Sequence, residues 1–327
     1  MDNLAHTLAG AALAETGLKR RTGLGTATLL IGANLPDLDV VALLFGSGLA
    51  FRRGWTHGVL ALFVLPLLLT AAMLLWSRYG RSGAAVDGTP VLPRQLLLLA
   101  FVGVFSHPLL DWLNTYGLRW LMPFDGTWFY GDALFIVDPW LWLILLIGAV
   151  LARRAKRSAA IAAIVVSMLY AGGMLASSAV GRRMVVESMR LEGFVIDDVM
   201  VGPVPVNPNR RQVVIRDGSR YMMGTLSWFP NARLDVSDRA VGINADDPAA
   251  RLAATASDVQ EFLGWARFPF YRIEPRGAGY TVVVDDLRYS DGLTASWAAV
   301  RVEVPGGGGR RVEGRPPGSE TASAGSP

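Results

Sequence analysis

Cysteine is absent from the 327-residue sequence, and histidine occurs only three times. The lack of cysteine excludes a disulfide framework and a thiolate metal site, so any metal must be bound by nitrogen and oxygen. Charged residues are also scarce, at 18% against 52% hydrophobic. The chain opens Met1-Asp2-Asn3 without a basic segment, so we expect no cleavable signal peptide and insertion directed by internal apolar segments.

The hydrophobic residues are concentrated before about residue 180, although the mean hydropathy of the whole chain is +0.35. About 20 apolar residues cross the hydrocarbon core of a bilayer. The sequence therefore predicts an α-helical polytopic membrane domain over residues 1–181. The apolar runs that support it are residues 4–14, 24–45 (interrupted by 34–39), 58–76, 95–113, 133–152 and 158–180.

The remainder of the chain has the composition of a soluble domain, and we predict a small extracytoplasmic α+β domain over residues 182–304. Asp217-Gly218 between two alternating runs predicts a β-hairpin over residues 211–228. Residues 258–267 predict an amphipathic helix, and residues 280–285 and 295–304 predict further strands. Residues 305–327 are rich in Gly, Ser, Pro and Arg, which predicts a disordered tail.

The net charge of +4 comes from short basic clusters that flank the apolar runs. Clusters in that position set membrane orientation and do not indicate a nucleic-acid partner. Placing residues 153–157 in the cytoplasm delivers residues 182–304 to the outside. The same topology brings seven polar residues to the outer face, namely His6, Asp37, Asp39, His57, His107, Asp111 and Asp138.

All three histidines lie in the membrane half, beside aspartates in an apolar context. An ionisable group at the bilayer centre costs at least ~2.5 kcal/mol, so such groups normally face an interior and have partners. A single buried Asp–His pair can simply satisfy hydrogen bonds or relay a proton. The set as a whole favours a divalent metal ion.

The spacing of these residues supports a metal site. His107 and Asp111 are an i, i+4 pair, which shares one face of a helix. Asp37 and Asp39 follow Pro36, and in an extended turn both carboxylates would point the same way. Oxygen and imidazole ligands suit zinc, manganese or iron, and more than four candidate ligands leave room for two ions.

Several other polar residues have candidate supporting roles. Arg53 lies one helical turn before His57 and is a candidate to bind a substrate phosphate or carboxylate, or a lipid headgroup. Asn34, Thr56 and Asn114 are candidates to orient ligands. Asp125 and Asp132 fit solvated turns better than a metal site. The tryptophans Trp55, Trp112, Trp120, Trp128 and Trp140 suggest an aromatic belt at the outer interface.

Four motifs, taken in order, resemble one known family. They are His6-Thr7-Leu8-Ala9-Gly10, Asn34-Leu35-Pro36-Asp37-Leu38-Asp39, Arg53-Gly54-Trp55-Thr56-His57-Gly58 and His107-Pro108-Leu109-Leu110-Asp111-Trp112-Leu113-Asn114. Over residues 1–180 the chain is similar to the YdjM-type family of bacterial inner-membrane proteins, described as membrane-bound metal-dependent hydrolases. Residues 204–208 and the hairpin after them also resemble longer members. A more distant likeness is to zinc-dependent phospholipases C.

The resemblance implies a multi-pass protein of the bacterial inner membrane and a metal-dependent hydrolase. It implies metal ligands at His6, Asp37, Asp39, His57, His107 and Asp111. We expect zinc first and manganese second, with a lipid-like ester or phosphoester as substrate at the outer face and the bilayer as partner. Asp37 and Asp111 are the candidate general bases, and Arg53 the candidate substrate-binding residue.

Two alternatives remain open at this point. A cation or proton transporter would line its path with the same carboxylates and histidines, but many transporters show repeated halves, and no internal repeat is visible in this sequence. A non-catalytic membrane scaffold would instead act through residues 182–304. It predicts normal behaviour after the histidines are removed.

Overall fold

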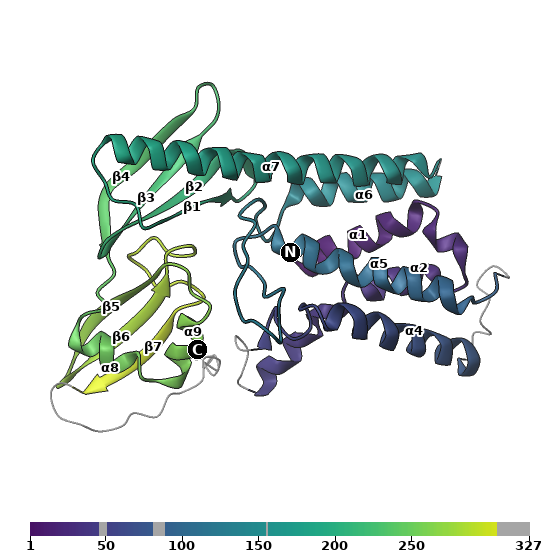
Figure 1. The fold of residues 1–327 in the computed structure, drawn as a ribbon, viewed down its shortest axis with the longest axis horizontal. Helices are drawn as coiled ribbons and strands as arrows, with labels where there is room; N and C mark the ends of the chain where they lie inside the picture. The colour runs from purple at the N-terminus through teal and green to yellow at the C-terminus, as the bar shows by residue number, and fades with distance from the viewer. Residues whose placement is uncertain (46–50, 81–88, 155, 306–327) are drawn as a thin grey trace, which may run out of the picture.

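The structure is a computed structural model that describes residues 1–45, 51–80, 89–154 and 156–305. Helices fill the first part of the chain and strands dominate the second (Figure 1), which confirms the predicted α-helical membrane region followed by a small α+β region. The predicted tail lies, beyond Pro305, outside the described residues. The helical elements of the first part are α1 (Asn3–Glu15), η1 (Leu18–Arg21), α2 (Gly25–Gly32), η2 (Leu35–Phe45), α4 (Ala61–Tyr79), α5 (Pro93–Trp112), α6 (Pro139–Arg154) and α7 (Ser158–Leu191).

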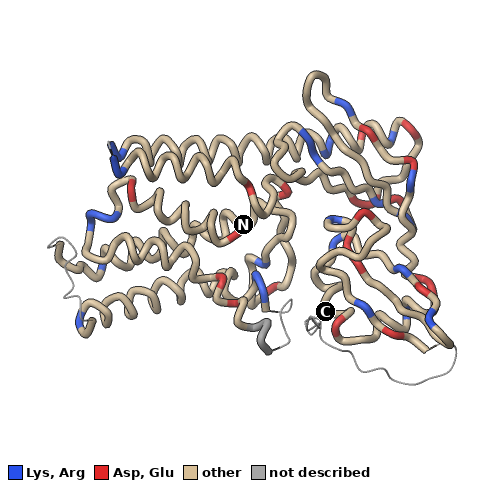
Figure 2. Tube along the Cα trace, turned by 180° about the vertical axis from the view of Figure 1, so that it is seen from behind, with Lys and Arg blue, Asp and Glu red and all other residues tan. Residues whose placement is uncertain are grey.

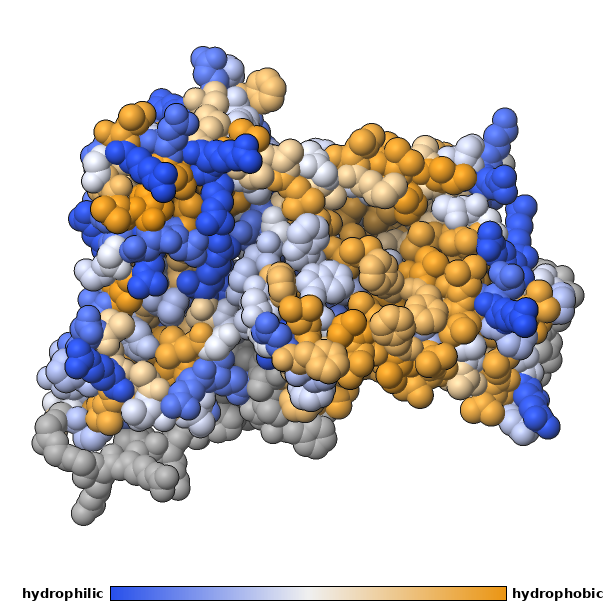
Figure 3. Space-filling model, in the orientation of Figure 1, coloured by the Kyte–Doolittle hydropathy of each residue, from blue (hydrophilic) through white to orange (hydrophobic). Residues whose placement is uncertain are grey.

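Within the described residues, three helices, α4, α5 and α7, are long and apolar enough to cross a membrane. They coincide with the apolar runs at 58–76, 95–113 and 158–180. Many of their large apolar side chains are exposed, such as Leu68 at 60% and Leu169 at 70%, and they form the apolar band in Figure 3. The run at 133–152 contains the shorter helix α6, which begins only after Asp138, whose carboxylate accepts the N–H of Leu141.

Basic residues gather at one end of the helical bundle, the end away from the strands (Figure 2). They include Arg78 in the last turn of α4, Arg153 and Arg154 in the last turn of α6, and residues 19–21 of η1. Glu15 at the end of α1 pairs there with Lys19 and Arg153, at 2.5 and 2.9 Å. The opposite end carries the histidines and aspartates, so the predicted orientation would place them at the outer face.

Glycine allows three helices to pack very closely beside the histidines. A Cβ on Gly103 of α5 would lie 3.0 Å from the Leu29 carbonyl oxygen and 3.2 Å from the Cα of Gly32, both on α2. Gly10 of α1 approaches the same carbonyl, where its Cβ would also lie at 3.0 Å. Gly103 precedes His107 by one helical turn, so this contact sets the position of His107 against α2.

The second part contains two antiparallel sheets and two short helices. The first sheet has the order β1-β2-β3-β4 and the second β5-β6-β7. The predicted hairpin is confirmed, because Asp217 pairs with Arg220 across a turn that contains Gly218 at φ +58°. The elements are β1 (Asp198–Val204), β2 (Asn207–Asp217), β3 (Arg220–Ser227), β4 (Arg233–Gly242), α8 (Pro248–Ala253), α9 (Ser257–Leu263), β5 (Pro269–Arg276), β6 (Gly279–Asp286) and β7 (Val300–Pro305).

Helix α7 joins the two parts without interruption. It has 34 residues and continues beyond the predicted boundary at residue 181. Its last turns pack on the first sheet, where Val185 and Met189 share a core with Val201 and Val213. The first ten residues assigned by sequence to the second part therefore complete the long helix of the first.

The second part is also fastened to the loop between α5 and α6. Trp128 in this loop donates its indole N–H to the Gly264 carbonyl at 2.9 Å, and Trp140 donates to the Val206 carbonyl at 2.9 Å. Buried Arg211 of β2 donates to the Ala133 carbonyl at 2.8 Å. Two of the five tryptophans expected in an aromatic belt thus have their polar edges in this junction.

Candidate metal centre

Four residues, Asp37, His57, His107 and Asp111, bring one ligand atom each to within 4.8 Å of one another. His107 and Asp111 lie on consecutive turns of α5, as their spacing predicted. Asp37 comes from η2, and His57 from the turns that precede α4. The close packing of α2 against α5 brings the η2 segment, which follows α2, beside His107.

The distances among these atoms resemble those around a single ion. His57 Nε2 lies 3.1 Å from His107 Nε2, and both lie close to Asp111 Oδ2, at 3.2 and 3.3 Å. Asp37 Oδ1 is 3.6 Å from His107 Nε2. Zinc binds nitrogen and oxygen at about 2.0–2.1 Å, which separates tetrahedral ligands by about 3.3–3.4 Å.

Hydrogen bonds on the far side of each imidazole fix which nitrogen faces the group. His107 Nδ1 lies 2.7 Å from the Ala33 carbonyl oxygen, which can only accept, so Nδ1 donates and the neutral ring has its lone pair on Nε2. His57 Nδ1 lies 2.9 Å from the Thr56 hydroxyl and 3.5 Å from Asp39 Oδ2. This contact to hydroxyl and carboxylate oxygens likewise favours the tautomer with the lone pair on Nε2.

In these tautomers, electron-pair donors of three residues face one another. Two imidazole lone pairs and one carboxylate oxygen converge in a fully buried place, and electron-pair donors at about 3 Å repel one another unless a proton or a metal ion lies between them. Burial lowers the pKa of His57, which favours the neutral imidazole that metals bind. Asp111 Oδ2 has no hydrogen-bond donor among the described residues. The donor set therefore fits a divalent ion.

Asp39 lies behind His57, in a different role from Asp37. Its Oδ2 accepts the backbone N–H of Arg53 at 2.7 Å and the Thr56 hydroxyl at 3.2 Å. The prediction that both carboxylates would point the same way from an extended turn was wrong, because residues 35–45 form a 3-10 helix. At three residues per turn, neighbours at i and i+2 project about 120° apart.

His6 stacks on the ring of His107, with centroids 3.7 Å apart and planes 15° apart. Its Nε2 lies 3.3 Å from Asp111 Oδ1, the oxygen that faces away from the four-residue group. Neither ring nitrogen forms a hydrogen bond within the described residues. His6 and Asp39 thus lie beside the four-residue group, and their direct ligation of a metal stays a prediction.

Arg53 is engaged by the protein on several sides. Its Nη2 lies 3.1 Å from Asp111 Oδ1, and its Nη1 donates to Asn114 Oδ1 at 3.3 Å. The guanidinium carbon lies 4.8 Å from the centre of the Tyr116 ring. The backbone of Arg53 is in the left-handed region, with φ +52°, a conformation that non-glycine residues hold only when the surroundings impose it.

The remaining polar candidates lie outside the group. Asn34 accepts from the Thr7 hydroxyl at 3.3 Å. Asp132 pairs with Arg267 at 2.8 Å, and Asp125 accepts from Thr127 in its own turn. Asp138 accepts the Tyr170 hydroxyl at 3.0 Å while it caps α6. Asn114 and Thr56 contact Arg53 and His57, as expected of residues that orient a site.

Sequence reasoning missed two neighbours of Asp111. The Met1 α-amino group contacts Asp111 Oδ1, and both groups are fully buried. Tyr116 lies one contact further from Asp111, with its ring against the Arg53 guanidinium. Neither belongs to a polar motif, and only their place in the folded bundle reveals them.

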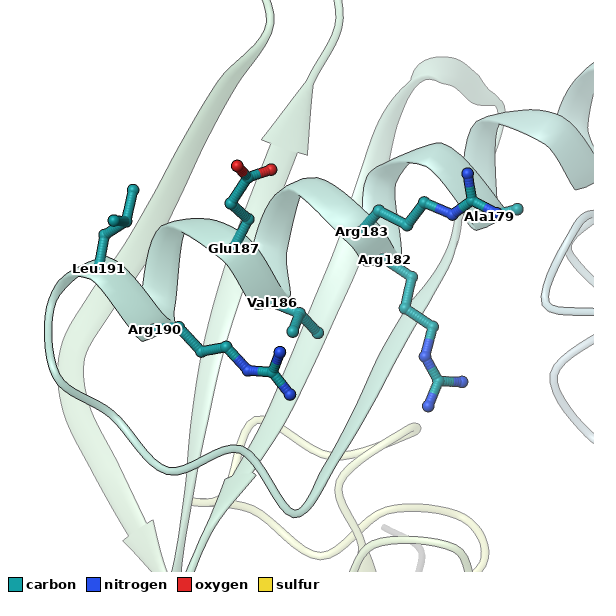
Figure 4. Close-up of a pocket in the computed structure, with 7 residues that line it drawn as sticks. All are labelled: Ala179, Arg182, Arg183, Val186, Glu187, Arg190 and Leu191. Atoms are coloured by element: carbon teal, nitrogen blue, oxygen red, sulfur yellow. The ribbon is translucent and has the colours of Figure 1, made fainter.

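A separate basic cavity of about 790 Å³ lies along the C-terminal end of α7. Figure 4 shows Arg182 and Arg190 extending to the same side of this helix and Glu187 to the opposite side. Arg182 is 3.5 Å from Asp198. The residues that line this cavity do not include those of the His/Asp group, so it is a distinct surface feature. They are Ala179, Arg182, Arg183, Val186, Glu187, Arg190 and Leu191.

The fold and the site describe a membrane protein whose helical bundle holds a His/Asp group able to bind a metal ion. The YdjM inner membrane protein family matches residues 1–182, and the chain belongs to this family. Inner membrane protein YbcI of Escherichia coli (strain K12) is 37% identical over 106 residues, which are 31% of this chain and 54% of YbcI. The chain thus spans about half the length of this curated relative. No solved structure matches the chain, and residues 183–305 lie outside the family match.

Proposed function

We propose that the protein is a membrane-bound metal-dependent hydrolase that cleaves an ester or phosphoester of a lipid-like substrate at the outer face of the inner membrane. One observation carries the proposal: three lone-pair-bearing atoms, on His57, His107 and Asp111, converge within 3.1–3.3 Å in a buried place. Zinc suits imidazole and carboxylate ligands in this geometry, and manganese is the second choice. When bound, such an ion supplies a Lewis acid and lowers the pKa of a coordinated water to near 7.

The residues of the site would have two roles, metal binding and general-base catalysis. His57, His107 and Asp111 would hold the ion, with their orientation fixed by Thr56, the Ala33 carbonyl and Arg53. Asp37 is the most accessible member, because its side chain is 12% exposed whereas the other three are fully buried. We therefore assign the general base to Asp37, which would accept the proton of the attacking water.

The position of the site supports a substrate that is anchored in the bilayer. The apolar side chains beside Asp37 are exposed, Leu38 at 59% and Val41 at 48%. Both belong to η2, the element that also carries Asp37, and Figure 3 shows the apolar surface of the helical bundle. A polar headgroup could reach Asp37 while acyl chains stay against this apolar surface.

The first test is elemental analysis of the detergent-purified protein beside the double variant His57→Ala/His107→Ala. We expect about one zinc or manganese ion per chain in the parent and none in the variant. Asp138→Asn is the matched control, because this buried carboxylate at the same end of the bundle caps α6 instead of joining the group. No bound metal in the parent after incubation with zinc and manganese would overturn the proposal.

Cleavage of fluorescent phospholipids and acyl esters in mixed micelles then tests the reaction. We expect Asp37→Asn to abolish turnover while it retains most of the bound metal. Loss of turnover is also expected for His57→Ala. Unchanged cleavage in either variant would remove its assigned role.

A further inference from the structure

The contacts behind Arg53 connect the metal centre to the second part of the molecule. Arg53 lies between Asp111 and Tyr116, with a carboxylate oxygen 3.1 Å from Nη2 and an aromatic ring centre 4.8 Å from Cζ. Arg53 is 5% exposed and Tyr116 6%. A desolvated guanidinium over a ring face is held more firmly than an exposed one.

Tyr116 is itself clamped from the C-terminal region. Its ring centre lies 4.8 Å from that of Trp265, and the Trp265 indole N–H donates to the Tyr116 carbonyl at 3.2 Å. Tyr116 therefore belongs to the core that α8, α9 and the second sheet build, together with Phe262, Val282 and Val304. A residue that follows α5 by only four positions is thus part of the core of residues 248–305.

The backbone around Tyr116 is fixed as well. Arg288 donates to the Thr115 carbonyl at 2.8 Å and to the Trp265 carbonyl at 3.1 Å, while Asp286 holds the guanidinium at 2.8 Å. On the other side, Asn114 Oδ1 accepts the Tyr116 N–H at 2.8 Å. The ring of Tyr116 therefore has little freedom to move away from Arg53.

We infer that Tyr116 is a positioning residue of the metal centre, whose ring, backed by Trp265, holds the Arg53 guanidinium against Asp111. Arg53 then binds Asp111 Oδ1, so that Oδ2 faces His57 and His107. The inference rests on the proposed function in so far as the group binds a metal. It gives the C-terminal region, which lies outside the family match, a task in the site.

Tyr116→Leu and Tyr116→Phe separate the ring from its hydroxyl in the full chain. Residues that orient metal ligands are worth roughly 10–100-fold in metal affinity, so we expect Tyr116→Leu to weaken zinc binding by about tenfold or more. Tyr116→Phe should keep the affinity of the parent, because the ring face remains. Tyr289→Leu is the matched control, since Tyr289 stacks on Trp265, with centroids 5.6 Å apart, in the same aromatic cluster. Zinc affinity is read by competition with a chromophoric chelator.

A second measurement does not depend on metal. In protein labelled with ¹⁵N-arginine, the Arg53 Nε–H resonance, assigned with Arg53→Lys, reports the ring current of Tyr116. We expect this resonance to move in Tyr116→Leu and to stay in place in Tyr116→Phe and Tyr289→Leu.

The two measurements separate the possible failures. An unmoved Arg53 resonance in Tyr116→Leu would overturn the inference, and so would a moved resonance with unchanged zinc affinity. Equal loss of affinity in Tyr289→Leu would also overturn it, because the effect would then belong to the aromatic cluster as a whole. A parent protein that binds no zinc defeats the proposed function, whereas the resonance still decides whether Tyr116 holds Arg53.

Discussion

The two parts of the molecule bury carboxylates in opposite ways. Asp286, in the C-terminal region, accepts from the Arg267 N–H and from three groups of Arg288, all within 2.7–3.0 Å. Asp111, in the membrane bundle, is equally buried, yet its Oδ2 has no donor among the described residues. The partners of Asp286 are all hydrogen-bond donors of the protein, whereas Asp111 pairs with Arg53 and Met1 through Oδ1 and turns Oδ2 toward two imidazole nitrogens, which makes it a candidate metal ligand.

The largest expected effect follows from removing the charge of Asp111. Asp111→Asn retains the size of the side chain but replaces one carboxylate oxygen by a weaker ligand or a donor. We expect zinc affinity to fall by about 100-fold or more, beyond the usual effect of a residue that only orients ligands. The measurement is a chelator competition titration, with near-UV circular dichroism to confirm folding. Parent-like affinity would show that Asp111 is as structural as Asp286.

Removing a buried, hydrogen-bonded carboxylate from the C-terminal region should instead affect stability. Asp285 is fully buried and accepts both the N–H and the hydroxyl of Ser296, at 2.8 and 2.5 Å. Asp285 also accepts the N–H of Asp286 at 2.8 Å, so Asp285→Ala leaves three donors without an acceptor, which should cost about 3 kcal/mol of the free energy of unfolding of this region.

Thermal unfolding followed by tryptophan fluorescence measures that loss, and zinc titration of the same variant is the control. We expect zinc affinity to be unchanged, because among the described residues Asp285 has no hydrogen bond or ion pair to the four-residue group or to Arg53. A fall in zinc affinity without a loss of stability would contradict this division between the two parts.

A change in the helix packing beside the site should have a smaller effect, on both stability and zinc affinity. An added Cβ at Gly103 would press on the Leu29 carbonyl and on Gly32, both backbone atoms that can move only with α2. We expect Gly103→Ala to destabilise the bundle by about 1 kcal/mol, the lower end of the cost of overpacking. Because Ala33, the residue that caps the C-terminus of α2, supplies its carbonyl to His107, zinc affinity should fall as well. A variant that loses stability but keeps its affinity would show that His107 does not depend on this helix contact.

The sequence predicted those features that depend on local spacing. The i, i+4 pair of His107 and Asp111, the three long apolar helices and the hairpin at Gly218 all appear where their patterns placed them. Which of Asp37 and Asp39 lies in the four-residue group was not predictable from spacing, because it depends on whether the chain after Pro36 is extended or 3-10 helical. In the folded chain this segment packs against α2, α4 and α5, and Asp39 accepts the Arg53 N–H at 2.7 Å.

Features that depend on contacts between residues far apart in the sequence could not be predicted either. Tyr116 lies 149 residues before Trp265, and no periodicity connects a loop after α5 with a turn after α9. Strands β1, β4 and β5 were missed as well. In β4 the apolar alternation is limited to Leu234 and Val236, and residues 237–240 are all exposed, so the pattern is too short to detect.

The smallest effect is expected for an exposed ion pair, which involves none of the buried carboxylates. Arg233 and Asp235 lie 2.6 Å apart on β4, but their side chains are 76% and 52% exposed. Water and salt screen such a pair, so Asp235→Ala should change the free energy of unfolding by about 0.5 kcal/mol or less and leave zinc affinity unaltered. Thermal unfolding at low and at high salt measures it. A loss as large as that expected for Asp285→Ala would contradict the comparison. It would mean that neither burial nor the number of hydrogen-bond partners predicts how much a carboxylate of this protein contributes to stability.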